Sequence, residues 1–219
     1  NKTLTAITVL SLLSLSSPAQ AQERWSLELR GNGSLPTQDL GADDLDTGFG
    51  FEGNVGYRFL PHLSAYLGWS WTKFGAEQSF AGPEMDFEET GYAFGLRYEH
   101  PFRGEVGDGL AGWVRAGGTY NHIEVEDTNG ELVSDSGHGL GWEAGAGLSM
   151  PLSNSWRLTP GVRYRSLSRD LTVGAQETGV DLQYLALEAD GSGVAYGYFA
   201  ETGLVQCRHL VYAVTSDSS

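Results

Sequence analysis

The sequence predicts an all-β protein, an eight-stranded antiparallel up-and-down transmembrane β-barrel. An alternating pattern of about ten residues, in which every second side chain is apolar or glycine, recurs about eight times along the chain. The apolar positions are rich in Tyr and Trp and the polar positions carry Arg and Glu, as in membrane barrels. After the leader, no segment approaches the ~20 consecutive apolar residues of a membrane helix. A chain that spans a membrane without helices has to close its sheet into a barrel.

A short leader precedes the repeated pattern. Lys2, an apolar run over residues 4–15 and Ala19-Gln20-Ala21 are typical of a secretory signal peptide. We therefore expect a signal peptide over residues 1–21, the barrel over 22–189 and a C-terminal extension over 190–219. Three interpretations of the extension stay open: a periplasmic tail, a competing last strand, or an end altered by a change of reading frame.

The first four predicted strands span residues 25–30, 47–59, 63–74 and 85–99. The fourth shows the alternation most cleanly, since Tyr92, Phe94 and Leu96 are separated by small residues and Arg97 follows. Side chains in a strand alternate between its two faces. One face of this strand is therefore apolar and the other is polar.

The last four predicted strands span residues 110–124, 138–150, 155–168 and 180–189. Val114 precedes Arg115 in the fifth strand and Trp142 precedes Glu143 in the sixth, so the two faces differ in the same way. The eighth strand is the least regular. Connections after the even-numbered strands, at residues 60–62, 100–109 and 151–154, are shorter than the polar connections after the odd-numbered ones. This asymmetry predicts periplasmic turns at one end and outside loops at the other.

Aromatic residues gather at the two ends of the predicted apolar face. Such girdles lie at the membrane interfaces. A soluble lipocalin-like barrel is the alternative. In such a barrel the Arg and Glu side chains of the polar face would be exposed, and the Trp and Tyr side chains of the apolar face would have to fill a small cavity. The predicted girdle residues are Trp25, Tyr57, Phe59, Trp71, Tyr98, Tyr120, Trp142, Trp156 and Tyr164.

The alternation places charged residues of both signs inside the barrel. Arginine forms bidentate pairs with carboxylates and stays charged when it is buried. A lumen this narrow predicts a salt-bridge plug; the alternative is a gated polar path opened by re-pairing of Glu52, Glu143 or Glu188. The predicted lumen charge network is Glu28, Arg30, Glu52, Arg58, Arg97, Glu99, Arg115, Glu143, Arg157, Arg163, Arg165 and Glu188.

The formal net charge of -15 argues against a nucleic acid partner, because the chain has no basic stripe. Acidic residues cluster between the strands, at residues 39–46, 77–89 and 124–135. We interpret these segments as solvated loops; the alternative is that they hold divalent cations among lipopolysaccharide headgroups. The single cysteine, Cys207, excludes an internal disulfide.

An enzyme of the lipid A deacylase kind would need a serine, a histidine and an acid close together. Ser134 or Ser136 with His138 and Glu143 are the candidates, but Gly139-Leu140 follow the histidine where such deacylases have a serine two residues later. Paired histidine spacing and HExxH are absent from the sequence. We expect no catalytic, cofactor or metal site.

The chain resembles the OmpA-like small outer-membrane β-barrel family over about residues 25–189. The resemblance rests on the leader and on residues 51–59 (FEGNVGYRF), 91–98 (GYAFGLRY) and 160–165 (PGVRYR). It implies a bacterial outer-membrane location, contact with membrane lipid and lipopolysaccharide, assembly by the barrel-insertion machinery, and an envelope or adhesion role. We expect a monomer with a structural or surface function. A narrow pore or carrier for small apolar solutes, similar to OmpW-like barrels, is the alternative, and a lipid A-modifying enzyme ranks below it.

Overall fold

The computed structural model describes residues 24–38, 45–79, 81–104, 106, 109–153, 156–173 and 176–194. These residues form nine strands of one antiparallel sheet. The predicted signal peptide over 1–21 and most of the predicted extension over 190–219 lie outside the described residues. The strands are β1 (Trp25–Pro36), β2 (Gly48–Leu60), β3 (Leu63–Ser79), β4 (Gly82–Pro101), β5 (Ala111–Glu126), β6 (Leu132–Asp135), β7 (Gly139–Pro151), β8 (Trp156–Val173) and β9 (Gln176–Val194).

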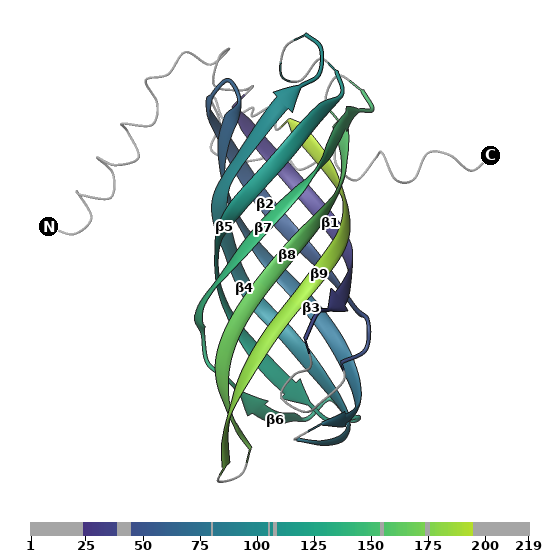
Figure 1. Ribbon diagram of the computed structural model, residues 1–219, viewed down its shortest axis with the longest axis vertical. Helices are drawn as coiled ribbons and strands as arrows, with labels where there is room; N and C mark the ends of the chain where they lie inside the picture. Colours follow the sequence, from purple (N-terminus) through teal and green to yellow (C-terminus); the bar gives the residue numbers. More distant parts are fainter. Residues whose placement is uncertain are drawn as a thin grey trace, which may run out of the picture. The chain divides into compact units, whose positions relative to one another are not determined.

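Eight of the strands close into a ring, which confirms the predicted fold class. The strands β1 to β5 pair in chain order, as do β7 to β9; β5 pairs with β7, and β1 pairs with β9 to complete the circle. The remaining strand, β6, is not part of the ring; among the described residues it pairs with β5 alone. Figure 1 shows the strands tilted around a common axis, with β6 at the end that also carries the β3–β4 and β8–β9 tips. Among the described residues, no helix is long and apolar enough to span a membrane.

Side chains of the membrane-spanning part follow the predicted alternation. On β4, Tyr92, Phe94 and Leu96 are between 42% and 52% exposed, whereas Ala93 and Arg97 are buried. An apolar residue that is exposed on the outer wall of a barrel contacts lipid. The outer wall is therefore the lipid face and the inner wall is the polar one.

The alternation reverses at the outer end of the barrel, which the sequence analysis did not predict. Beyond Tyr92, the outward row of β4 continues with Glu88 and Asp86, while Phe87 points inward and is only 1% exposed. Ten other buried side chains, from the four strands β3, β5, β8 and β9, pack with it. They are Phe74, Ala76, Ile123, Val125, Leu167, Leu171, Val180, Leu182, Tyr184 and Ala186. This outer apolar core gives the end of the barrel the pattern of a soluble protein, with apolar side chains inside and charges outside.

The outer apolar core explains why two predicted loops are strands. The expected long loops after the third and seventh strands are wrong, because β3 and β4 are joined through residues 80–81 and β8 and β9 through residues 174–175. Inward residues such as Phe74, Phe87 and Leu171 give these strand extensions an interior to pack on. The long connections are residues 37–47 and 127–138, and the second of these contains β6.

The last strand of the ring is longer than the sequence suggested. The predicted strand over 180–189 is β9, which runs from Gln176 to Val194 and pairs with β1 as far as Ser26↔Val194. The barrel thus includes residues 190–194, which the sequence analysis placed in the extension. Asp190 and Ser192 continue the inward row of Glu188, so polar residues at these positions fit a lumen wall.

Candidate functional site

The middle of the lumen is filled by five charged side chains. Glu52 of β2 and Glu143 of β7 lie between Arg115 of β5 and the Arg163–Arg165 pair of β8. Arg165 Nη2 lies 3.0 Å from Glu52 Oε2 and 2.6 Å from Glu143 Oε2, and Arg115 Nη2 lies 3.0 Å from Glu52 Oε1. Arg163 contacts both carboxylates as well. All five side chains are at most 1% exposed, so this central network closes the lumen.

Inward glycines make room for two aromatic rings beside this central network. Tyr66 donates a hydrogen bond of 2.8 Å to Glu143, and Arg115 lies over its ring at 4.6 Å. A Cβ added at Gly117 would come within 2.4 Å of the Tyr66 hydroxyl. A Cβ at Gly161 would likewise come within 2.4 Å of the Trp113 ring. Gly117 and Gly161 therefore leave room for the neighbouring aromatic side chains.

A second group of charges lies on the periplasmic side of the central network. Arg30 of β1 contacts Glu28 at 2.7 Å, Glu188 at 3.0 Å and Asp190 at 3.1 Å. Arg97 of β4 contacts the other oxygen of Glu28 at 2.9 Å. Glu28 and Glu188 each have two arginine partners, which compensates their burial, whereas Asp190 is in contact with Arg30 alone among the described residues.

The periplasmic mouth holds the remaining predicted network residues. Glu99 lies 3.4 Å from Arg97 and 3.6 Å from Arg157. A small open cavity lies at this mouth, and Arg58, Ser26 and Ser64 are among the residues that line it. This cavity reaches inward as far as Arg97 and Tyr66, on the periplasmic side of the central network.

Glu89 links the central network to the outer apolar core. It accepts hydrogen bonds from Arg165 at 2.9 Å, from Tyr184 and from Asn121, and it is fully buried. The acidic run over residues 77–89 predicted a loop position for Glu89, which is wrong. Its odd number on β4, shared with Arg97 and Ala93, is the signal that places it on the inward face. Beyond Glu89 the outer apolar core begins.

Buried charges of opposite sign are equal in number. Among the described residues, the buried side chains with a formal charge are six arginines and six carboxylates, so their formal charges cancel and the excess of -15 lies elsewhere. Glu89, Asp190 and Arg169 belong to this set and were absent from the predicted network. The set is Arg30, Arg97, Arg115, Arg163, Arg165, Arg169, Glu28, Glu52, Glu89, Glu143, Glu188 and Asp190.

The predicted girdle residues lie on the outer wall at two levels. Trp25 and Tyr57 pack at 4.9 Å near the short turns, and Trp142 and Tyr164 pack at 5.3 Å nearer the outer end. Phe59, Tyr98 and Trp156 belong to the first level and are 40–52% exposed. Trp71 and Tyr120 belong to the second. Beyond the second level the outward rows of β4 and β8 are polar, with residues such as Glu88, Asp86 and Asp170, so this level marks the outer membrane boundary.

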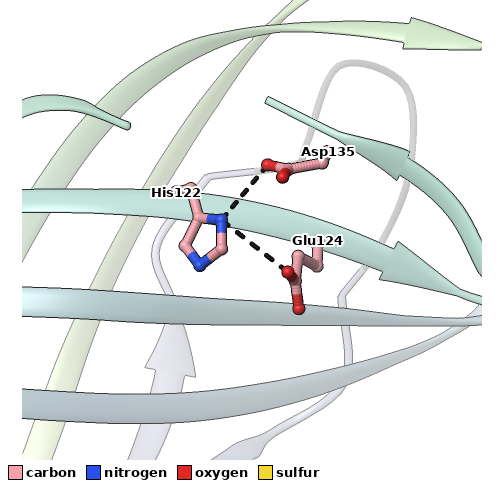
Figure 2. A group of neighbouring side chains, drawn as sticks. All are labelled: His122, Glu124 and Asp135. Atoms are coloured by element: carbon pink, nitrogen blue, oxygen red, sulfur yellow. Dashed lines mark hydrogen bonds and ion pairs between the residues drawn. The ribbon is translucent and has the colours of Figure 1, made fainter. Parts of the chain in front are cut away.

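Above that boundary, the outer wall carries a cluster of His122, Glu124 and Asp135. His122 Nδ1 lies 3.7 Å from Glu124 Oε1 and 3.2 Å from Asp135 Oδ1, as Figure 2 shows. This cluster is not evident from the sequence, which predicted no metal site. His122 and Glu124 are two residues apart on β5 and therefore share one face of the strand. Asp135 reaches them only because β6 folds back onto β5.

The candidate deacylase residues do not come together. Glu143 is bound in the central network, and the His138 ring stacks on His122. Ser134 donates to the carbonyl of Thr172, and Ser136 donates to the carbonyl of Gly137. These four residues therefore form no Ser–His–acid group.

A closed ring of strands with a lipid-facing apolar wall, two aromatic girdles and a charged interior defines an integral membrane β-barrel protein. Residues 7–199 match the outer membrane protein beta-barrel domain family, and the chain belongs to it. The protein is accordingly an outer-membrane barrel of bacteria. No curated protein matches the sequence.

Several solved outer-membrane barrels share this fold. The crystal structure of Neisserial surface protein A has a TM-score of 0.58 and 17% identity, covering 78% of this chain and 96% of that one. AlkL, solved by solid-state NMR in DMPC bilayers, has a TM-score of 0.54 and 17% identity, covering 83% and 94%. OprG from Pseudomonas aeruginosa has a TM-score of 0.51 and 14% identity, covering 80% and 99%. At these identities the likeness concerns the fold alone.

Proposed function

We propose that this protein is a closed outer-membrane barrel with a structural and surface role, which supports the envelope and presents its outer end outside the cell. The observation that carries the proposal is the filled lumen. The central network blocks the membrane-spanning part, and the outer apolar core blocks the part beyond it. An ion that crossed the barrel would have to pass both.

Opening such a lumen has a high energetic cost. Arg163 and Arg165 are fully buried, and a buried ion that loses its partner costs several kcal/mol even after relaxation. A path made by re-pairing would have to give each displaced carboxylate another arginine. The side chains of the outer apolar core are hydrophobic apart from the Tyr184 hydroxyl, which binds Glu89. Arg169 lies at this end of the lumen, but its guanidinium is already bound to backbone carbonyl oxygens.

The proposal is tested by conductance in planar bilayers. The full-length barrel is expected to give no conductance steps, while a general porin reconstituted in parallel gives the steps that show the bilayer is competent. Steps of porin size from the wild-type barrel, lost when the protein is unfolded by heat, would contradict the closed lumen.

We infer a role without catalysis. The serine, histidine and acid considered for a deacylase are dispersed, which supports this inference. Mass spectrometry of lipid A from cells that express the protein checks it, and an unchanged acyl pattern is expected. A shifted acyl mass that is lost in a His138→Ala variant would contradict it.

The proposed partners are outer-membrane lipid, lipopolysaccharide and the barrel-insertion machinery, with the barrel as a monomer. The apolar outer wall between the two girdles supports the lipid contact. Charged outward residues above it, such as Lys73 and Glu88, lie at the level of the outer headgroups. Native mass spectrometry from detergent is expected to show a single copy of the chain, and a stable dimer would contradict the monomer.

One observation favours a second function, a carrier of small apolar solutes. The outer apolar core forms a hydrophobic section of the lumen that ends on Glu89. Its side chains fill the space in this structure, so entry of a solute would require them to move. Uptake of an apolar solute into proteoliposomes separates the two functions: the structural role predicts the rate of empty vesicles, and the carrier role predicts saturable uptake.

A further inference from the structure

The cluster of His122, Glu124 and Asp135 has the geometry of a metal site. His122 and Glu124 are two residues apart on β5, so their side chains leave the same face of the strand. Asp135 of β6 is the direct ladder partner of Glu124. One ligand atom of each residue lies within 4.8 Å of the other two. Figure 2 shows the three side chains directed toward one another.

The imidazole is held in place independently of the two carboxylates. The ring of His122 stacks on His138 with a centroid distance of 4.4 Å and an interplanar angle of 14°. His138 in turn packs against Tyr120 at 5.2 Å. This stack leaves Nδ1 directed at the acids. A ligand whose ring orientation is already fixed loses little entropy when it binds a metal.

The surrounding wall has more negative charge than its cations balance. Across the β4–β5 ladder Glu88 faces Glu124 and Asp86 faces Glu126, and like charges in direct opposition destabilise a sheet. Lys73 contacts the other three carboxylates, at 2.9 Å from Asp86, 2.8 Å from Glu88 and 3.9 Å from Glu126. Within the described part of the chain, Glu124 and Asp135 make ion pairs with His122 alone.

The facing carboxylates of Glu88 and Glu124 repel one another, as do those of Asp86 and Glu126. A bound divalent cation would offset the same repulsion. Glu88, Glu124 and Glu126 also have ligand atoms within 4.8 Å of one another, so Glu124 is shared by two groups of potential ligands.

The donor atoms indicate which metal fits. One imidazole nitrogen with two carboxylate oxygens suits borderline cations such as Zn²⁺, whereas Ca²⁺ and Mg²⁺ take oxygen ligands. Ligands at about 2.0–2.1 Å from a tetrahedral Zn²⁺ are roughly 3.3 Å apart. The distance of 3.2 Å from His122 Nδ1 to Asp135 Oδ1 matches this value, and the 3.7 Å to Glu124 requires a small rotation of the carboxylate.

We propose that His122, Glu124 and Asp135 bind a divalent cation of the Zn²⁺ type on the outer wall, above the membrane boundary. The three protein ligands leave a position open toward the outside. Because Asp135 belongs to β6 and the other two ligands to β5, the bound metal fastens β6 to the barrel. The site lies outside the lumen, so this proposal does not depend on whether the lumen is closed.

The test is calorimetric titration of Zn²⁺ into the full-length, chelator-treated barrel in detergent micelles. His122→Ala and Asp135→Asn are each expected to weaken binding about tenfold or more. His100→Ala is the control, because His100 is also a histidine of the barrel strands but lies at the periplasmic end. Zn²⁺ binding of wild-type strength in both His122→Ala and Asp135→Asn would overturn the proposal.

Two further measurements keep the proposal testable if one of these variants fails to fold, and they show which group of ligands holds the metal. Hydrogen exchange of amides 132–136 in the wild-type protein is expected to slow when Zn²⁺ is added, and unchanged exchange at saturating Zn²⁺ would overturn the fastening of β6. A double Glu88→Gln, Glu126→Gln variant is expected to lose less Zn²⁺ affinity than His122→Ala, because these two acids add negative charge near the site but provide no ligand atom to it. If it loses binding while His122→Ala does not, the metal lies in the carboxylate group and the proposed site is wrong.

Discussion

Glu52 and Glu143 share the same three arginines. Each carboxylate contacts Arg115, Arg163 and Arg165. Their strands, β2 and β7, are four steps apart in either direction around the ring of eight, so the two glutamates come from opposite walls. The three arginines therefore connect opposite sides of the barrel, and the charge network holds the cylinder closed across its width.

Replacement of Glu143 by Gln is expected to destabilise the barrel strongly. The variant leaves three buried arginines with one carboxylate fewer, and removing one partner from a buried ion pair costs about 3–5 kcal/mol. Urea unfolding in lipid vesicles measures the change. Glu131→Gln, in an exposed connection, is the matched control and is expected to change the free energy of unfolding by less than about 0.5 kcal/mol. Equal stability of the two variants would show that the network contributes little.

Replacement of a glycine beside Tyr66 by alanine is expected to destabilise the barrel, because this glycine makes room for the Tyr66 side chain. In Gly117→Ala the new Cβ would lie 2.1 Å from the Phe94 carbonyl oxygen and 2.4 Å from the Tyr66 hydroxyl, which overpacks the lumen at a cost of about 1–3 kcal/mol. Gly31→Ala is the control, because nothing lies within 4 Å of its Cβ. The same urea titration compares them, and a larger loss in Gly31→Ala would contradict the account of the inward glycines.

Alternation alone was sufficient to predict the membrane-spanning part. A period of two fixes which side chains face lipid, and the outward row of Tyr92, Phe94 and Leu96 could be read without a structure. The same rule would have found Glu89 and Asp190, which share the parity of Arg97 and Glu188. They were missed because Glu89 stands in an acidic run and Asp190 follows the expected end of the last strand.

Other features depend on contacts between distant segments. The outer apolar core joins five strands, and no single strand shows that Phe74, Phe87 and Leu171 meet. There the apolar residues occupy the inward positions that are polar lower in the barrel, so the local pattern reads as an irregular loop. The cluster of His122 with Asp135 likewise depends on the fold-back of β6, which is only four residues long.

The outer apolar core is expected to stabilise the strand extensions. Leu171→Ala removes a fully buried side chain at a cost of about 2–5 kcal/mol, whereas Leu132→Ala changes a leucine that is 58% exposed. Hydrogen exchange of the β3–β4 and β8–β9 extensions should rise in the first variant only. Faster exchange confined to the membrane-spanning residues would contradict the separate packing of this end.

The outer face of β4 is expected to tolerate charge according to depth. Phe94 lies between the two girdles and Asp86 above them, on the same outward row. Phe94→Arg should cost about 2–4 kcal/mol and Asp86→Arg about 0–1 kcal/mol, since an arginine at the bilayer midplane is far from water. Unfolding of both variants in the same vesicles measures the difference. An equal cost would contradict the membrane boundary drawn from the aromatic girdles.

Acid is expected to loosen the connection between β5 and β6. Asp127 accepts backbone hydrogen bonds of 2.8 Å from Glu131 and from Asn129, and its side chain also pairs with that of Asn129 at 3.1 Å. The backbone hydrogen bond from Glu131, followed by the side-chain bond from Asn129, lowers the pKa of the Asp127 carboxyl. Because the folded pKa is depressed, the stabilising effect is present above the ordinary aspartate value of about 3.9 and disappears as the pH falls through the lowered pKa. The amide resonances of residues 129 and 131 should shift with a midpoint below that value, and Asp127→Asn should abolish the shift. A midpoint at or above the ordinary value would mean that the anionic carboxylate does not hold this turn.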